Sequence, residues 1–131
     1  MTSPFEKYRS ILLDEDYSTA TSLQTFVLSL YNGASTQFRA DTLRNYDAKH
    51  TAIFIEFVES YNRHGENDEA FMQVCRDMWA QRKQMGADHL ARVAAHEAIS
   101  PQDYDEGVSE WHSERRWLEE RTEAFRAKGW I

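Results

Sequence analysis

The sequence predicts an all-α protein, a compact bundle of five to six helices in one domain with a long C-terminal helix. Apolar residues recur at intervals of three and four along most of the chain, which is the spacing of a helix face. Five glycines and two prolines are few for the many tight turns of a sheet protein. Hydrophobic residues make up 41% and aromatic residues 13% of the 131 residues, which is enough to fill one core at this length.

The first helix is predicted to begin at Ser3 and Pro4, because serine caps a helix N-terminus and proline suits the first helical position. A second helix should begin near Asp16 or Ser18. It carries one apolar stripe, made of Leu23, Phe26, Val27, Leu30 and Tyr31. Asn32 and Gly33 are predicted to end it in the left-handed conformation that both residues tolerate. A short helical turn is expected over residues 40–44.

A third long helix should run from an Asp47 cap to Gly65. Its stripe contains Ile53, Phe54, Ile55, Phe57, Val58 and Tyr61. Asn67 is predicted to cap the next helix, and Gly86 to stop it. The stripe of that helix contains Phe71, Val74, Cys75, Met78 and Trp79.

A smaller helix is expected over residues 87–98, marked by Leu90, Val93 and Ala94. Ser100 and Pro101 should then start the long C-terminal helix. Its seam holds one large side chain every seven residues, namely Tyr104, Trp111, Leu118 and Phe125. Gly129 should end that helix and let Trp130 pack back on Phe125. Gly86 thus subdivides the domain 1–131 into a helical bundle, 1–86, and an acidic helical pair, 87–131.

The formal net charge of −7 argues against binding to nucleic-acid phosphates as the main activity and is compatible with a basic protein partner. Residues 87–131 contain six basic and ten acidic residues, a net charge of −4, which leaves −3 for residues 1–86. One cysteine, Cys75, cannot form an internal disulfide and favours a reducing compartment. There is no signal-peptide pattern and no apolar run of membrane length, so a cytoplasmic protein is expected.

Catalytic signals are weak. A metal- or thiol-dependent enzyme would draw on His89, His96, Asp103 and Cys75, but the histidines lack metal-ligand spacing and read as surface or helix-end residues. Cys75 lies on an apolar stripe, which favours a buried, inert thiol. No nucleophile elbow or phosphate-binding glycine loop is present. We therefore predict no catalytic residues, metal or cofactor, and keep the enzyme as an alternative.

A second alternative is a nucleic-acid-binding accessory protein that uses Arg39, Arg44 and Lys49. Asp41 and Asp47 lie in the same segment, so an ordinary mixed surface competes with that interpretation.

The candidate partner-binding residues lie in the C-terminal segment. They are Asp103, Asp105, Glu106, Glu110, Glu114, Trp117 and Glu120. The acids do not match an EF-hand loop, and the bland interpretation is a solvated helix face. Trp111 and Trp117 are six residues apart and so lie on different helix faces. Trp117 and Trp130 are therefore either exposed interface residues or part of a helix buried on two sides, two alternatives of equal weight.

One stretch, Leu23 to Trp79, carries a family resemblance. Its features are Phe26-Val27-Leu28-Ser29-Leu30-Tyr31-Asn32-Gly33, then Phe38-Arg39-Ala40-Asp41-Thr42-Leu43-Arg44-Asn45-Tyr46-Asp47, and then Met78-Trp79-Ala80-Gln81-Arg82. The stretch resembles a small domain of unknown function encoded on proteobacterial plasmids and prophages. It departs from that family in having Arg44 at a tryptophan position and in its added C-terminal helices.

The resemblance implies an origin in a mobile element. Small acidic helical proteins of such elements often bind a host machine, and this chain is similar to anti-CRISPR proteins in size, charge and lack of catalytic motifs. The predicted function is therefore binding and inhibition of a host nucleic-acid-handling defence complex without catalysis. The expected partner is a protein complex with a basic surface, such as a CRISPR-Cas effector.

Overall fold

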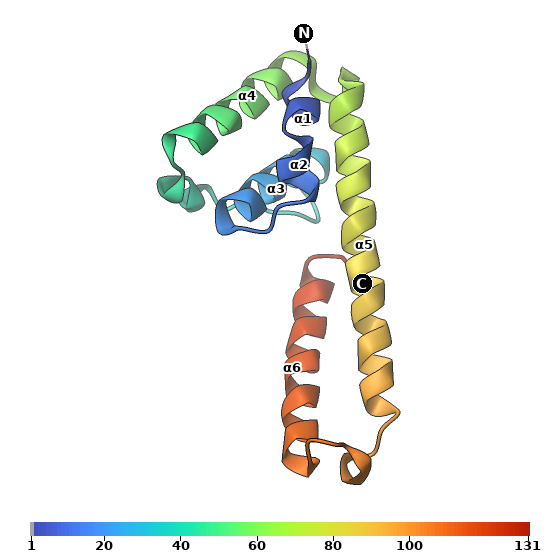
Figure 1. Ribbon diagram of the computed structural model, residues 1–131. Coiled ribbons are helices and arrows are strands. Elements are labelled where there is room, and N and C mark those ends of the chain that lie inside the picture. The colour runs from blue at the N-terminus through green and yellow to red at the C-terminus, as the bar shows by residue number, and fades with distance from the viewer. Residues whose placement is uncertain (1) are drawn as a thin grey trace. The chain divides into compact units, whose positions relative to one another are not determined.

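The computed structural model describes residues 2–131, which form six α-helices and three short 3₁₀ helices (Figure 1). The predicted all-α class and the long C-terminal helix are confirmed. The chain divides into two compact units, Met1–Ala80 and Gln81–Ile131. The longest helix, α5 (Glu69–Glu97), spans the boundary between these units, and the subdivision predicted at Gly86 falls inside it. Across residues 2–131, no helix combines the length and the apolar character that crossing a membrane requires.

The first unit contains the helices that precede α5 and the start of α5 itself. The preceding helices are α1 (Pro4–Lys7), α2 (Arg9–Leu13), α3 (Ser18–Tyr31), the 3₁₀ helix η1 (Ala40–Asn45), α4 (Ala48–His64) and the short 3₁₀ helix η2 (Gly65–Asn67). Ser3 caps α1 as predicted, because its hydroxyl accepts a hydrogen bond from the Phe5 N–H at 3.2 Å. The single first helix of the prediction is in fact two, which meet at Tyr8.

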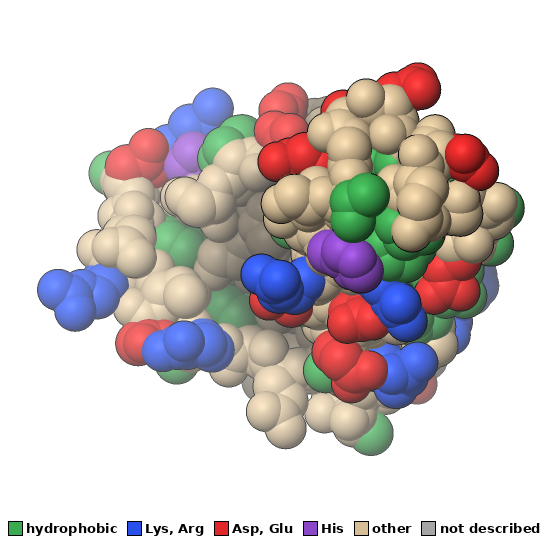
Figure 2. Space-filling model, turned by 90° about the horizontal axis from the view of Figure 1, so that it is seen from below, with side chains coloured by type: hydrophobic (Ala, Val, Ile, Leu, Met, Phe, Trp, Pro, Cys, Tyr) green, Lys and Arg blue, Asp and Glu red, His purple; other side chains and the backbone are tan. Residues whose placement is uncertain are grey.

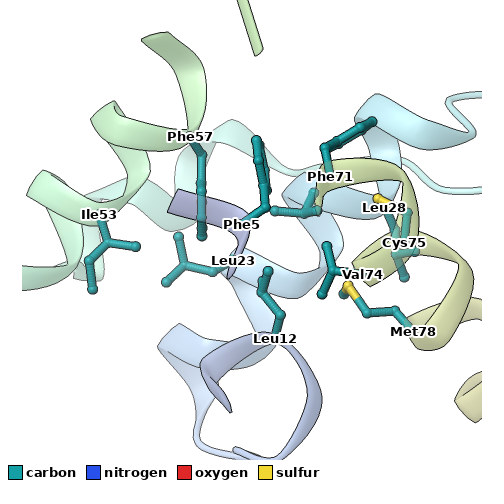
Figure 3. Packing of buried hydrophobic residues seen from close by; sticks show 11 residues of the cluster. Phe5, Leu12, Leu23, Leu28, Ile53, Phe57, Phe71, Val74, Cys75 and Met78 are labelled. Carbon is teal, nitrogen blue, oxygen red and sulfur yellow. The ribbon is translucent and has the colours of Figure 1, made fainter. Parts of the chain in front are cut away.

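Three phenylalanines form the centre of the core of the first unit (Figure 3). The Phe5 ring stacks on Phe57 with centroids 4.9 Å apart and meets the edge of Phe71 at 4.8 Å. These rings come from α1, α4 and α5 and are completely buried. Leu12 and Leu23 extend the cluster to α2 and α3. Aromatic side chains of this size bury much apolar surface each, so this cluster supplies a large part of the stability of the unit.

Two predicted caps in the first unit have a different form. Helix α3 ends at Asn32 as predicted, but Asn32 has a φ of −146°, so the left-handed ending is wrong. The Asn32 side-chain oxygen instead accepts the Ser35 N–H at 3.3 Å and forms a turn. Asp68, and not Asn67, caps α5, since its carboxylate accepts the Ala70 N–H at 3.0 Å.

The apolar stripe of α4 is narrower than predicted. Ile53 and Phe57, four residues apart, are buried, and Phe54 and Tyr61 pack against the core. Ile55 and Val58 are exposed. Ile55 lies on the far side of the helix, because a helix turns about 100° per residue and cannot direct Ile55 and Phe57 to the same side, and Val58 lies at the edge of the stripe, one residue beyond Phe57.

The second unit contains the rest of α5, the 3₁₀ helix η3 (Pro101–Asp103) and α6 (Val108–Ala127), which runs back alongside α5 (Figure 1). Gly86 does not stop α5, and the separate helix predicted over residues 87–98 is wrong. The lack of a side chain at Gly86 has another use. An added Cβ would overlap the Trp130 carbonyl oxygen and would lie 2.7 Å from Ile131 Cγ2. Gly86 therefore provides the space in which the end of the chain packs on α5.

The inward face of α5 in this unit consists of buried Arg82, Gly86, His89 and His96 and half-buried Val93, spaced four and three residues apart. Leu90 is 46% exposed, and Ala94 is also exposed, so of the three apolar residues that marked the expected smaller helix only Val93 lies on the inward face. The opposing face of α6 is the predicted one and buries the large side chains Trp111, Leu118 and Phe125. The α5 face is thus mostly polar, and it packs against these large apolar residues of α6.

Both ends of α6 are set by glycines. The helix begins at Val108 and not at Ser100, because Gly107 has a φ of 100° and separates it from η3. Tyr104 therefore lies in the connection and outside the α6 seam. At the other end Gly129 has a φ of 76°, its N–H bonds the Arg126 carbonyl, and the Trp130 N–H bonds the Phe125 carbonyl, each at 3.0 Å. This is the predicted left-handed helix end, of the Schellman type.

Candidate functional site

A groove of about 470 Å³ lies in the second unit. Its lining residues are Arg92, Tyr104, Glu106, Glu110, Ser113, Glu114 and Trp117. The last four lie on α6 at steps of three, one and three, so they share one face of that helix. Arg92 comes from α5, and Tyr104 and Glu106 come from the connection between η3 and α6. The groove is therefore built by the hairpin of α5 and α6.

One side of the groove already holds a guanidinium group. Arg92 Nη2 donates to Glu114 Oε1 at 2.9 Å, and Arg92 Cζ lies 4.7 Å from the centroid of the Trp117 ring. Arg121 Cζ lies 4.9 Å from the same ring. Guanidinium groups are attracted to the negative face of an indole at such distances. The Trp117 ring is thus a platform for cations, and 40% of its residue surface remains exposed.

The lining of the groove carries a net negative charge. It holds three carboxylates and one guanidinium group. Glu106 and Glu110 form no ion pair with any other residue between 2 and 131. Burial is the main cause that raises the pKa of Tyr104, and the charges of Glu106, Glu114 and Glu110 raise it further, while Arg92 opposes them. A cation entering the groove would meet the carboxylates of Glu106 and Glu110, which are unpaired among the described residues.

The groove gathers four of the seven residues that the sequence suggested for partner binding, namely Glu106, Glu110, Glu114 and Trp117. The other three lie outside it. Asp103 accepts a hydrogen bond from the Ser100 hydroxyl at 2.8 Å, and Asp105 and Glu120 are exposed elsewhere in the unit. Whether any of the seven binds a partner stays a prediction.

The two tryptophans that the sequence left undecided differ. Trp117 is exposed. Trp130 is half-buried, with its ring 5.2 Å from that of Phe125.

Sequence reasoning missed Arg92, Tyr104 and Ser113. The seven-residue spacing from Trp111 predicts Tyr104 in the α6 seam, but the turn at Gly107 breaks that register. Arg92 was missed because its contact with α6 depends on tertiary structure. Ser113 follows Glu110 by three residues, a spacing that places both on one helix face and would have identified it.

The net charge does not mark the second unit as the acidic one. With the boundary after Ala80, it contains eight basic and ten acidic residues, a net charge of −2, because Arg82 and Lys83 belong to it. The first unit has seven basic and twelve acidic residues, a net charge of −5. The distinguishing feature of the second unit is therefore the local arrangement of carboxylates and rings in the groove.

His89 and His96 are buried, with 6% and 7% exposure, so their prediction as surface residues is wrong, whereas His96 does lie at a helix end, in the last turn of α5. Thr122 donates its hydroxyl hydrogen to the Leu118 carbonyl, so its oxygen accepts from His89 Nε2 at 2.8 Å. His96 Nε2 donates to the Trp111 carbonyl at 3.1 Å, and the two rings stack 4.8 Å apart. Both imidazoles join α5 to α6 as flat polar packing groups.

The arrangement of the histidine, acidic and cysteine side chains gives little support to the metal- or thiol-dependent enzyme alternative. Within residues 2–131, no group of three or more histidine, cysteine, aspartate or glutamate side chains is arranged to hold a metal ion. Cys75 is completely buried, and burial raises the pKa of its thiol to about 12. The thiol is therefore protonated at neutral pH, whereas a cysteine nucleophile reacts as the thiolate.

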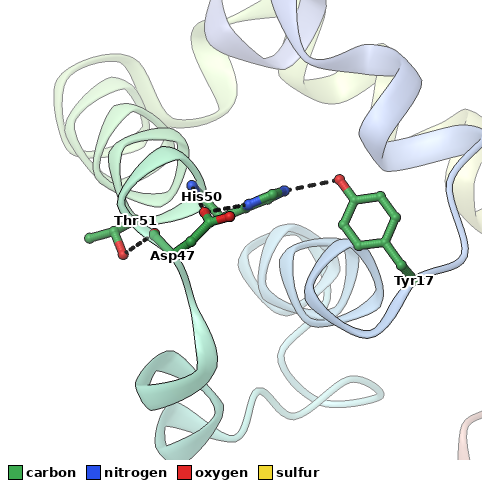
Figure 4. A network of polar contacts seen from close by, with 4 residues as sticks. All are labelled: Tyr17, Asp47, His50 and Thr51. Atoms are coloured by element: carbon green, nitrogen blue, oxygen red, sulfur yellow. Dashed lines mark hydrogen bonds and ion pairs between the residues drawn. The ribbon is translucent and has the colours of Figure 1, made fainter.

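A carboxylate–imidazole–hydroxyl chain lies in the first unit (Figure 4). Asp47 Oδ1 accepts from His50 Nδ1 at 2.7 Å, and Tyr17 OH lies 3.0 Å from His50 Nε2. This is the order of groups in hydrolase triads. Burial first, and then the charges of Glu15 and Asp47, raise the pKa of Tyr17, so its hydroxyl stays protonated.

None of these three residues lines the groove in the second unit or the one of about 680 Å³ in the first unit. The chain of hydrogen bonds links the start of α3 to the start of α4, because Tyr17 precedes α3 and Asp47 caps α4. We therefore assign it a structural role.

The groove in the first unit lies among α1, α4 and the start of α5. Three of its four carboxylates, those of Glu56, Asp68 and Glu69, have partners, and Glu59 forms no ion pair with any described residue. Glu56 lies 3.5 Å from Lys7 Nζ and accepts the Tyr8 hydroxyl, and Asp68 accepts the Ser3 hydroxyl at 2.6 Å. Less charge is left there for a ligand than in the groove of the second unit.

The segment with Arg39, Arg44 and Lys49 is a mixed surface. Arg39 pairs with Asp41 at 2.8 Å, and Lys49 follows the Asp47 cap. Figure 2 likewise shows basic and acidic side chains interleaved over the face it presents. This arrangement lacks the basic stripe that tracks a nucleic-acid backbone.

Comparison of the chain with protein families, with curated proteins and with solved structures finds no match. The resemblance of Leu23 to Trp79 to a mobile-element domain therefore stays a prediction.

Proposed function

We propose that this chain is a mobile-element protein that binds a host nucleic-acid-handling defence complex, such as a CRISPR-Cas effector, and inhibits it without catalysis. The single observation that carries the proposal is the groove of the second unit, where Glu106 and Glu110, which form no ion pair with any described residue, line the same groove as the exposed ring of Trp117. Aromatic rings with a polar rim are the usual anchors of protein interfaces.

The charge of the groove suits the proposed partner. A channel that holds nucleic acid is lined with arginine and lysine, so an acidic surface is attracted to it and competes with the nucleic acid. The net charge of −7 speeds the approach of such a partner at low salt. The groove then supplies specific contacts that bulk charge does not.

Two features support binding over catalysis. The buried Cys75 thiol, whose pKa is raised to about 12, suits a structural residue. The His89 and His96 rings are held in the packing between α5 and α6.

A phage plaque assay tests the proposal. Bacteria with an active CRISPR system that targets the phage would express the chain, and the expected result is restored plaque formation. Expression of the chain in bacteria without the system controls for effects on phage growth. The proposal would be contradicted if CRISPR interference were unchanged for every CRISPR type tested and if the purified chain formed no stable complex with the purified effector complexes.

A further inference from the structure

We infer that the groove of the second unit binds an arginine side chain of the partner, at the end formed by Tyr104, Glu106 and Glu110. The inference rests on the proposed function and specifies its partner chemistry. Arginine is the proposed occupant. Equal binding of lysine, or occupation of the groove by nucleic acid or by a second copy of the chain, would contradict the inference.

The chain itself shows how the groove accommodates a guanidinium group. Arg92 places its guanidinium between the Glu114 carboxylate, 2.9 Å from its Nη2, and the Trp117 ring, 4.7 Å from its Cζ. One carboxylate and one aromatic ring thus suffice to seat this group on an exposed surface. The Arg92 side chain is 58% exposed, so the seat is formed without deep burial.

The rest of the groove repeats these components without a cation. Tyr104 supplies a half-buried ring, which is held by the edge contact with the His96 ring at 5.4 Å. Glu106 and Glu110 supply two carboxylates four positions apart across the start of α6, and neither is paired within residues 2–131. Burial first, and then the charges of Glu106, Glu114 and Glu110, raise the pKa of Tyr104, while Arg92 lowers it.

The groups at this end of the groove, one ring and two carboxylates, favour arginine over lysine. A guanidinium is planar, stacks on a ring and donates along its edge to carboxylates, so it engages Tyr104 with its face and Glu106 or Glu110 with its edge. An ammonium is a strongly hydrated point charge and gains less from the ring. The groove volume of about 470 Å³ lies within the range of pockets that hold small ligands, so it accommodates this second side chain beside Arg92.

The experiment is a calorimetric titration of the full-length chain with three short peptides of alternating glycine and a second residue, namely arginine, lysine or citrulline. The arginine peptide should bind, the lysine peptide should bind several-fold more weakly, and the neutral citrulline peptide should not bind. In the double variant Glu106→Gln/Glu110→Gln, the affinity for the arginine peptide should fall about tenfold or more. Equal binding of the arginine and lysine peptides would overturn the inference.

A matched control separates the groove from bulk charge. Asp105→Asn/Glu120→Gln removes the same two negative charges from exposed sites outside the groove and should weaken the arginine peptide by less than about threefold. If both double variants lost the same affinity for the arginine peptide, the effect would be due to net charge alone, and the groove would not be the binding site. All four replaced residues are exposed, so folding should be retained, and circular dichroism checks this.

Two further measurements cover the other occupants. Self-association of the chain that disappears in Glu106→Gln/Glu110→Gln would assign the groove to a second copy, and binding of single-stranded DNA or RNA lost in the same variant would assign it to nucleic acid. Either result overturns the arginine assignment. If the groove variant still inhibits the defence complex as well as the unaltered chain, the arginine groove is wrong while the proposed function stands.

Discussion

Gly86 gives the most direct test of how the second unit is packed. In the middle of an exposed helix, replacing glycine by alanine stabilises by about 1 kcal/mol, because alanine loses less backbone entropy. Gly86 is inside α5 but buried, and its missing side chain faces the Trp130 carbonyl oxygen and the Ile131 side chain. Gly86→Ala should therefore have opposite effects with and without the end of the chain.

The size of the effect follows from the contacts. The new methyl group would overlap the Trp130 carbonyl oxygen, which is backbone and cannot move by a simple side-chain rotation. Overpacking of this kind costs about 1–3 kcal/mol. After subtraction of the helix-propensity gain, the full chain should lose between about 0 and 2 kcal/mol. A chain shortened after Gly129 lacks the clash and should gain about 1 kcal/mol from the same substitution.

The assay is a double-mutant cycle of thermal or urea unfolding on four proteins, the full-length and the shortened chain, each with and without the Gly86→Ala substitution. The coupling free energy between the substitution and the truncation should equal the clash alone, about 1–3 kcal/mol. Trp130 fluorescence should also change in the full-length variant, because the end of the chain must leave its place on α5. A coupling near zero, with stabilisation in both backgrounds, would refute the packing of Trp130 and Ile131 against Gly86.

Three further predictions concern the first unit. Cys75 should react with iodoacetamide at about pH 8 only as fast as the chain unfolds, since burial raises the pKa of its thiol to about 12, and fast reaction of the folded chain would contradict its burial. The hydrogen bond from the Arg9 side chain is the main cause that lowers the pKa of Asp77. The stability that Asp77 contributes is therefore fully present above the pKa of the unfolded chain, near 3.9, and is lost as the pH falls through the lower pKa of the folded chain. Asp77→Asn should accordingly destabilise at neutral pH, and the difference from the unaltered chain should vanish on acid titration followed by circular dichroism. Tyr17→Phe should cost less than about 1 kcal/mol in urea unfolding, because it removes one exposed hydrogen bond to His50, and a larger loss would show that this contact holds α3 and α4 together more tightly than assigned.

Most of the helices could be predicted because their signals are local. Ser3, Asp47 and Gly129 each act within four residues of their own position, by capping an adjacent helix end. The seven-residue spacing of Trp111, Leu118 and Phe125 likewise reports one helix face directly. These positions match the structure because neither a cap nor a periodicity needs knowledge of a distant segment.

The misjudged positions depend on distant segments. Gly86 has the sequence signature of a helix end, yet the helix continues, because its lack of a side chain serves packing by Trp130 and Ile131 more than forty residues away. His89 and His96 read as surface residues because imidazole is polar. Their rings become buried only when α5 pairs with α6, where His89 packs against Phe125 and His96 packs against Trp111.

The candidate groove was predictable in part. Glu106, Glu110, Glu114 and Trp117 fall close together in the sequence, so their composition and spacing marked them. Arg92 reaches them only through the α5–α6 hairpin, and Tyr104 only through the turn at Gly107. The feature that gives the groove its chemistry, a guanidinium between a carboxylate and an indole, is therefore tertiary in origin.

The central claim is that this groove, and not the general acidity of the chain, binds the partner. The most direct measurement is the Kd for the purified defence complex, compared among the unaltered chain, Glu106→Gln/Glu110→Gln and Asp105→Asn/Glu120→Gln. The groove pair should raise the Kd about tenfold or more, equivalent to about 1.4 kcal/mol, while the control pair with the same charge change should leave it within about threefold. Equal increases in the Kd for both pairs, or no increase for the groove pair, would contradict the claim.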